Sequence, residues 1–316
     1  MSLFSAIFVC ARDGSLMRIQ RANGTWVGAR QLEDAGAQCV AISQRRVLVG
    51  THDRGVLFSA DAGESWEQAD LPERSVFSVA ISDADGALYA GTEPSRLFVS
   101  RDAQHWSELE ALQRIPSRDR WSFPPRPWTH HVRWIAPDPR HQERLLVGIE
   151  LGGLMYSDDA GETFSDHRPG AKRDVHNVVW HPRVQGRVYE AAGDGAAFSR
   201  DGGLTWEAAD GGRDLPYCWA LAVDASDPES WYVSAASGPG TAHRGTDARG
   251  ALYRWSGKAW KQLALPDDTM PYALVASDAE LIAGMADGRI IHSGDRGQSW
   301  TDTGVQAGPV VALAAD

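Results

Sequence analysis

Four side chains capable of acid, base or metal-binding chemistry stand at the ends of short apolar runs in this chain. His131 and His176 stand where such runs begin, and Glu93 and Glu150 follow the ends of two others. Two imidazoles and a carboxylate could hold a divalent metal ion and leave open positions for water or substrate. Without a metal, a glutamate whose pKa is raised by burial could act as a general acid or base beside a neutral histidine. Either chemistry requires a fold that brings these positions together.

The elements that carry these residues follow a repeated signature, S-x-D-x-G-x-[S/T]-[W/F]. Its complete copies span residues 59–66, 157–164, 199–206 and 293–300, and a copy at 100–106 is one residue short and lacks the glycine. Short apolar runs of strand type precede each copy, so that one unit of about forty residues contains four strands. The aspartate can accept hydrogen bonds from its own turn, the glycine supplies a positive φ, and the aromatic residue packs between units. We therefore predict a structural role for the signature and no catalytic role for its aspartates.

Seven such units fit into the chain. They end at the aromatic residues 26, 66, 106, 164, 206, 260 and 300. The strand expected near the C-terminus has no partner after it, whereas the first unit lacks its first strand. We therefore predict one all-β domain over residues 1–316, a seven-bladed β-propeller of four-stranded antiparallel blades in which the C-terminal strand joins the N-terminal blade. The predicted blades comprise residues 309–316 plus 5–26, then 37–66, 75–106, 129–164, 174–206, 217–260 and 271–300.

With these repeats the sequence resembles the Asp-box, or BNR-repeat, propellers, which include sialidases, sortilin-type receptors, xyloglucan-cleaving glycosidases and photosystem II assembly factors. The resemblance covers nearly the whole chain and implies the propeller fold, but one propeller fold carries hydrolases, receptors and scaffolds. Sialidase activity is not expected. The three convergent arginines, the tyrosine nucleophile with its glutamate and the aspartic acid of that family cannot be matched residue by residue, and seven units differ from the six blades of sialidases.

Two enlarged connections, residues 107–128 and 237–250, interrupt the period of the repeat. In such a propeller both lie on the face opposite the signature turns, and long loops on a rigid scaffold are common places for binding sites. Alignment of the first strands predicts one ring of residues at the axial mouth of this face: Pro309, Gln38, Phe77, His131, His176, Trp219 and Pro271. Alignment of the second strands predicts another ring there: Arg12, His52, Glu93, Glu150, Gly193 and Ala286.

These two rings define the predicted site. Its catalytic residues are Glu150, His176, His131 and Glu93, and a divalent metal ion would bind His131, His176 and Glu150. Its substrate-binding residues are Arg12, His52, Trp219, Arg126 and Trp128. Of these, Arg126 and Trp128 belong to the first enlarged connection, which could place guanidinium groups and aromatic faces over an anionic, sugar-like or aromatic ligand. The alternative is structural: the polar residues line a wet channel, and the connection packs its aromatics on the rim.

The composition limits the classes of partner that we expect this protein to bind. The chain has 31 basic and 42 acidic residues, a formal net charge of −11, and so lacks the broad basic surface of a nucleic-acid-binding protein. Its three cysteines include no C-x-x-C pair, which disfavours a disulfide framework or a thiolate zinc site. No leader or membrane-spanning run is evident. We therefore expect a cytoplasmic protein with a small-molecule or glycan ligand and no nucleic acid or membrane partner, although a protein partner fits the composition equally well.

Three functions are compatible with these sequence features. The first is a hydrolase or lyase, metal-assisted or acid/base, with its site at the axial mouth beneath the two enlarged connections. The second is a non-catalytic protein-interaction or assembly scaffold that uses the same face. The third is a glycan-binding protein or glycosidase, for which two carboxylates must face one cleft.

Overall fold

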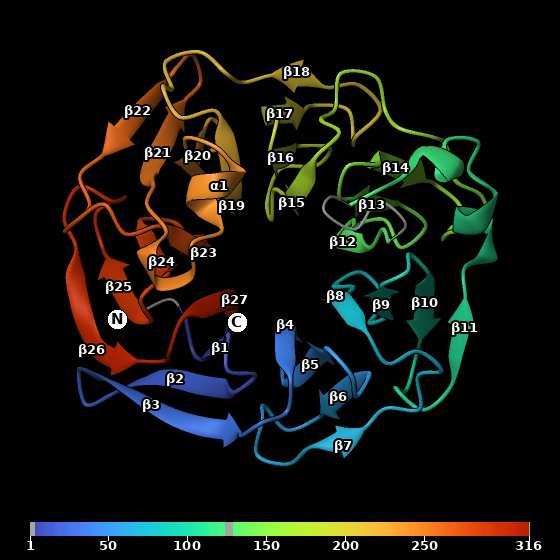
Figure 1. The fold of residues 1–316 in the computed structure, drawn as a ribbon, viewed down its shortest axis with the longest axis horizontal. Helices are drawn as coiled ribbons and strands as arrows, with labels where there is room; N and C mark the ends of the chain where they lie inside the picture. Colours follow the sequence, from blue (N-terminus) through green and yellow to red (C-terminus); the bar gives the residue numbers. More distant parts are fainter. Residues whose placement is uncertain (1–3, 124–128, 316) are drawn as a thin grey trace.

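The structure is a computed structural model that describes residues 4–123 and 129–315. Its sheets form a ring with the first strand of each sheet nearest the axis (Figure 1). Sheets one to three contain β27 (Val310–Ala315), β1 (Ile7–Ala11), β2 (Leu16–Ala22) and β3 (Thr25–Leu32); β4 (Ala37–Ser43), β5 (Arg46–Thr51), β6 (Val56–Ser59) and β7 (Glu67–Gln68); β8 (Val76–Ile81), β9 (Leu88–Thr92), β10 (Leu97–Ser100) and β11 (Trp106–Glu108).

The remaining sheets complete the ring. They contain β12 (Val132–Pro137), β13 (Leu145–Ile149) and β14 (Gly153–Ser157); β15 (Val175–Trp180), β16 (Val188–Ala192), β17 (Gly195–Ser199) and β18 (Glu207–Ala208); β19 (Tyr217–Val223), β20 (Ser230–Ala236), β21 (Ala251–Ser256) and β22 (Trp260–Leu263); β23 (Pro271–Ser277), β24 (Glu280–Met285), β25 (Arg289–Ser293) and β26 (Thr301–Gln306). The predicted seven-bladed antiparallel propeller is confirmed.

Closure of the ring follows the prediction. Strand β27 pairs antiparallel with β1, from Ile7 opposite Ala315 to Cys10 opposite Ala312. The first blade is thus built from both ends of the described chain, and β1 is paired on both of its edges.

The fourth blade differs from the prediction because its outer strand is reduced to a single bridge between Tyr156 and Ser165. Beyond that bridge one backbone hydrogen bond remains, from the N–H of Arg168 to the Leu154 carbonyl, and side chains make the other contacts. The backbone N–H of Leu154 donates to the His167 ring at 3.2 Å, and the Asp166 carboxylate accepts from Ser117. These contacts draw the segment away from the sheet toward the first enlarged connection.

The signature turns have the predicted chemistry. In the blade-5 turn, Ser199 Oγ accepts the N–H of Gly203 at 2.9 Å, and the Asp201 carboxylate accepts the N–H and the hydroxyl of Thr205. Gly203 has a φ of 87°, in the left-handed region that favours glycine. Trp206 packs in a cluster with Leu146 of the preceding blade. The aspartates of these turns therefore stabilise hairpins and are not free for chemistry.

The enlarged connections carry the helical turns η1 (Glu110–Arg114), η2 (Arg118–Arg120), α1 (Pro239–Ala242) and η3 (Gly245–Asp247). The described part of the first connection packs Leu112, Ile115 and Trp121 into the core between the third and fourth blades. This agrees with the structural alternative for residues 107–123. No helix within 4–123 or 129–315 has the length and apolar character needed to cross a lipid bilayer.

Candidate functional site

In each blade, a β-bulge near the start of the first strand determines which side chain the blade presents at the axial mouth. The register shifts lie between Val76 and Ser78, between Val132 and Trp134 and between Val175 and Asn177, so that the extra residues are Phe77, Arg133 and His176. Bulges commonly re-aim a side chain beside functional sites. The predicted equivalence of His131 and His176 is therefore wrong, because Arg133 occupies the position of His176 in the fourth blade.

The starts of the first strands also show which residues of other blades are equivalent to His131. It directly precedes β12, just as Ser75 precedes β8 and Asp174 precedes β15. Alignment on the valine that opens each of these strands, instead of on the residues that close them, would have identified Arg133 and Asp174 from the sequence. In the first and seventh blades the same shift replaces Pro309 and Pro271 by Val311 and Tyr272.

The second predicted ring agrees with the strand ends. Each of its members directly follows the second strand of a blade; they are Arg12, His52, Glu93, Glu150, Gly193 and Ala286. The V-G-T and related sequences before these positions keep the register regular, so the side chains were aligned correctly.

Glu150 is the centre of a buried cluster formed by blades 4 and 5. His131 Nε2–H donates to Glu150 Oε2 at 2.7 Å, and Arg133 Nε lies 3.3 Å from the same oxygen. The other oxygen, Oε1, lies 3.8 Å from His176 Nε2. Burial alone would raise the pKa of Glu150, but the His131 hydrogen bond and the Arg133 charge lower it to about 2. Glu150 is thus a buried anion with one oxygen occupied and the other facing His176.

His176 is fixed in one tautomer. Its Nδ1 lies 2.6 Å from the carbonyl oxygen of Cys218, which can only accept, so Nδ1 carries the proton. Burial lowers the pKa of His176 to about 4, and the ring is neutral at physiological pH. The lone pair of Nε2 therefore faces Glu150 and Asp174.

Asp174, which the sequence patterns did not indicate, completes this group. Its Oδ1 lies 3.7 Å from His176 Nε2. A side chain at position 193 would exclude it, because a Cβ on Gly193 would lie 1.8 Å from Asp174 Oδ2. Burial and the charge of Glu150 raise the pKa of Asp174 to about 7. The absence of a side chain at Gly193 thus leaves room for the Asp174 carboxylate, which directly precedes the first strand of the same blade.

Aromatic rings enclose the cluster. The Arg133 guanidinium lies 5.0 Å from the centre of the Trp219 ring, and the His176 ring lies 4.6 Å from it. Phe77 stacks on His131 with ring centres 3.9 Å apart. Trp219, one of the predicted residues, therefore belongs to this site.

Both enlarged connections also reach the cluster. Phe123 of the first packs its ring edge against His131 at 4.8 Å. His243 of the second places Nε2 3.2 Å from the hydroxyl of Tyr217, which lies 3.4 Å from His176 Nε2. The predicted meeting of long connections with the histidines and carboxylates is thus present in the structure.

The other predicted residues lie apart from this cluster. His52 and Glu93 line a neighbouring cavity of about 520 Å³ together with Ser75, Phe77, Pro94 and Thr129. Phe77 separates this cavity from His131. Arg12 is exposed after β1, where its charge acts on His243 and Tyr272. Arg126 and Trp128 lie outside the described residues.

The groups able to hold a metal ion also differ from the predicted set. One ligand atom each from Glu150, Asp174 and His176 lies within 4.8 Å of the others. His131 directs its Nε2 at Glu150 Oε2 and is thereby engaged as a donor. The converging set therefore contains Asp174 in the place predicted for His131.

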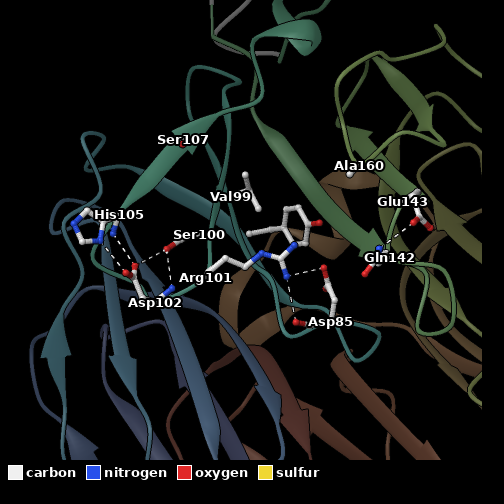
Figure 2. Close-up of a pocket in the computed structure, with 11 residues that line it drawn as sticks. Asp85, Val99, Ser100, Arg101, Asp102, His105, Ser107, Gln142, Glu143 and Ala160 are labelled. Atoms are coloured by element: carbon white, nitrogen blue, oxygen red, sulfur yellow. Dashed lines mark hydrogen bonds and ion pairs between the residues drawn. The ribbon is translucent and has the colours of Figure 1, made fainter.

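A second cavity lies on the opposite face, beside the incomplete signature copy of the third blade. It has a volume of about 360 Å³ and is bordered by the third and fourth blades. Figure 2 shows its polar groups paired with one another: Arg101 lies 2.7 Å from Asp85, and the His105 ring lies 2.8 Å from Asp102. Because these polar groups pair with one another, this cavity offers fewer groups to a ligand than the cluster at the mouth does.

Comparison with known proteins identifies the fold. No family model and no curated protein matches this chain. It is similar to the GH74 xyloglucanase from Xanthomonas campestris, with 18% identity and a TM-score of 0.71 over 99% of this chain and 52% of that one. It is also similar to YCF48 bound to D1 peptide, with 17% identity and a TM-score of 0.57 over 93% and 92% of the two chains.

A third similar structure is the WD40 β-propeller domain of Doa1, with 14% identity and a TM-score of 0.64 over 93% and 90% of the two chains. At these identities the similarities show the propeller fold alone. The chain spans about half the length of the xyloglucanase.

Proposed function

We propose that this propeller is a hydrolase or lyase that acts on a small polar ligand at its axial mouth, with Glu150, Asp174 and His176 as the reacting groups. The observation that carries the proposal is the convergence of two carboxylates and an unprotonated imidazole nitrogen within 4.8 Å. A propeller needs no such group at these positions, because other blades place Val311 and Ala286 there.

The surrounding residues suit this chemistry. His131 and Arg133 fix Glu150 in one orientation, which favours a preorganised anion over a mobile one. Arg133 and the face of Trp219 offer a cation and an apolar surface to an anionic or aromatic part of the ligand. The neighbouring cavity with His52 and Glu93 has room for the rest of the molecule. The three groups serve hydrolysis or elimination either by moving protons or by holding a metal ion.

A non-catalytic scaffold is the second candidate, and it is supported by the similarity of this chain to YCF48 bound to D1 peptide, a peptide-bound structure of similar fold. In that case the mouth binds a peptide or protein segment and Arg133 pairs with a carboxylate of the partner.

Glycoside cleavage is a narrower form of the first candidate. The predicted pair, Glu93 and Glu150, lies in two neighbouring parts of the mouth separated by Phe77 and His131. The close pair is instead Glu150 and Asp174. Carboxyl groups roughly 5 Å apart suit a retaining glycosidase, so glycosides belong in the substrate panel.

The test is a turnover assay of the full chain with chromogenic esters, lactones, glycosides and uronates that undergo β-elimination. Glu150→Gln and His176→Ala should each reduce turnover of the accepted class by at least about a hundredfold. Glu67→Gln, an exposed glutamate in the outer strand β7, is the matched control and should retain wild-type activity. Turnover that survives Glu150→Gln, or no turnover of any class, contradicts the enzyme and leaves the scaffold.

A further inference from the structure

We infer that Glu150, Asp174 and His176 bind one divalent transition-metal ion, of which Zn²⁺ is the representative. The inference deepens the proposed function, because it assigns the activating group of the same site. Metal binding can nevertheless be measured without any substrate.

The distances between the donor atoms fit such an ion. His176 Nε2 lies 3.8 Å from Glu150 Oε1 and 3.7 Å from Asp174 Oδ1. Two ligand atoms about 2.1 Å from a tetrahedral zinc ion are ~3.4 Å apart. The two distances from His176 exceed this value by a few tenths of an ångström, and the two carboxylate oxygens, which lie within 4.8 Å of each other, must approach by up to about 1.4 Å. Three ligands so placed leave a fourth position for water or substrate.

The imidazole is prepared as a ligand by its backbone contact. The proton on His176 Nδ1 is donated to the Cys218 carbonyl at 2.6 Å, which directs the Nε2 lone pair at the carboxylates. A hydrogen bond from the distal nitrogen to a backbone carbonyl is the usual support of a metal-bound histidine. The side chain is fully buried, so solvent does not provide a donor for Nε2.

The acceptors that face one another form a place where a positive charge would be stabilised. In the described part of the chain, Glu150 Oε1 accepts no hydrogen bond, because His131 donates to Oε2. The donor near His176 Nε2 is the hydroxyl of Tyr217, at 3.4 Å, and this hydroxyl also faces His243. When both carboxylates are ionised, their oxygens and the lone pair repel one another at such distances, and a cation among them relieves this repulsion.

The charges of Glu150, Asp174 and Arg133 are compatible with a divalent cation at this site. Arg133 lies beside Glu150 Oε2 and not beside Oε1, so it balances one carboxylate from the far side of the group. With the ion bound, the two carboxylates and Arg133 leave one positive charge in excess, which suits a bound hydroxide or an anionic ligand. One nitrogen and two oxygen donors favour Zn²⁺ or Mn²⁺ over Mg²⁺ and Ca²⁺, which prefer oxygen alone.

The experiment uses the untagged full chain, stripped with a chelator and titrated with Zn²⁺ by calorimetry. We expect one ion per chain, and at least about tenfold weaker binding in Asp174→Asn and in His176→Ala. His105→Ala and Asp268→Asn, exposed residues of the same types, are the controls and should bind like wild type. Circular dichroism verifies that each variant is folded.

Two further measurements separate the alternatives. His131→Gln should weaken zinc binding less than His176→Ala does, since His131 acts on Glu150 and not on the ion. Co²⁺ bound in place of Zn²⁺ should give visible d–d absorption that Asp174→Asn changes. Absence of stoichiometric binding, or binding unaffected by Asp174→Asn and His176→Ala, overturns the inference.

Failure of the metal site and failure of the proposed function give different results. Turnover that needs Glu150 but persists in the chelated protein removes the metal and keeps the enzyme. Stoichiometric zinc binding without turnover of any substrate class keeps the metal site and removes the enzyme.

Discussion

The two faces of the ring use carboxylates in opposite ways. At the signature turns, Asp295 accepts the N–H and the hydroxyl of Ser299, and these hydrogen bonds lower its pKa to about 2. At the mouth, Asp174 is partly buried beside another carboxylate, and burial raises its pKa to about 7. Carboxylates satisfied by their own hairpin stabilise the fold, whereas carboxylates held by neighbouring elements and left with free lone pairs are available for chemistry.

The largest expected effect lies at the mouth. Glu150→Ala removes the anion that His131 and Arg133 contact, and leaves both without their partner inside the protein. We expect a loss of about 3 kcal/mol in the free energy of unfolding, measured by urea denaturation. A variant as stable as the wild type would show that the mouth carboxylate is as dispensable as a surface group, and the contrast between the faces would fail.

An intermediate effect is expected at Glu190, a buried carboxyl in β16 that belongs to neither face. Its Oε2 accepts the N–H of Lys172 at 2.9 Å, and Oε1 has no partner in the described part of the chain. Burial raises the pKa of Glu190 from 4.5 to about 8, with Asp194 raising it further and Lys172 opposing. The folded protein therefore binds this proton more tightly than the unfolded chain, and stability falls as the pH rises from about 4.5 to about 8.

Glu190→Gln removes that pH dependence. We expect the variant to exceed the wild type by at least about 1.4 kcal/mol near the upper end of this range, the equivalent of one pKa unit, and to lose the advantage near the lower end. Urea denaturation at several pH values measures the difference. Parallel pH profiles for the two proteins would contradict the expectation.

The smallest effect is expected at a signature turn. Ser199→Ala removes the acceptor of the Gly203 N–H and should cost about 1 kcal/mol in the free energy of unfolding. Zinc binding and any turnover should stay at wild-type levels, because the turn lies on the face opposite the mouth. A change in ligand binding here would show that the two faces are coupled.

The sequence predicts the blades and their closure because each depends on local patterns: the signature turn, the apolar runs and the unpaired first and last strands. It predicts Glu150 because a V-G-I run of regular pairing fixes its place after β13. It misplaces His131 by two positions because the alignment used the residues that close the first strands, whereas the equivalent bulges in β12 and β15 lie at a fixed distance from the valines that open them.

Asp174 was missed because the alignment on the closing residues left its position out of both rings. Its fit beside Gly193 and its raised pKa depend on residues of other strands, which the residues around Asp174 do not show. The missing outer strand of the fourth blade is similar, because the His167 ring accepts the N–H of Leu154, which a backbone ladder would otherwise pair. Sequence patterns predict hydrogen bonds between backbones better than they predict places where a side chain replaces a backbone partner.

The pairing of β1 with β27 has a consequence for biosynthesis. During synthesis on the ribosome, the N-terminal blade contains only β1, β2 and β3 until the other blades have been translated. Its innermost strand, β27, is translated last. Contacts between such distant segments slow folding and expose an open sheet edge during synthesis. The nascent chain is thus most vulnerable to aggregation before β27 is translated. A charged substitution along the unpaired edge of β1 would reduce this aggregation but would weaken the pairing of β1 with β27 in the folded protein.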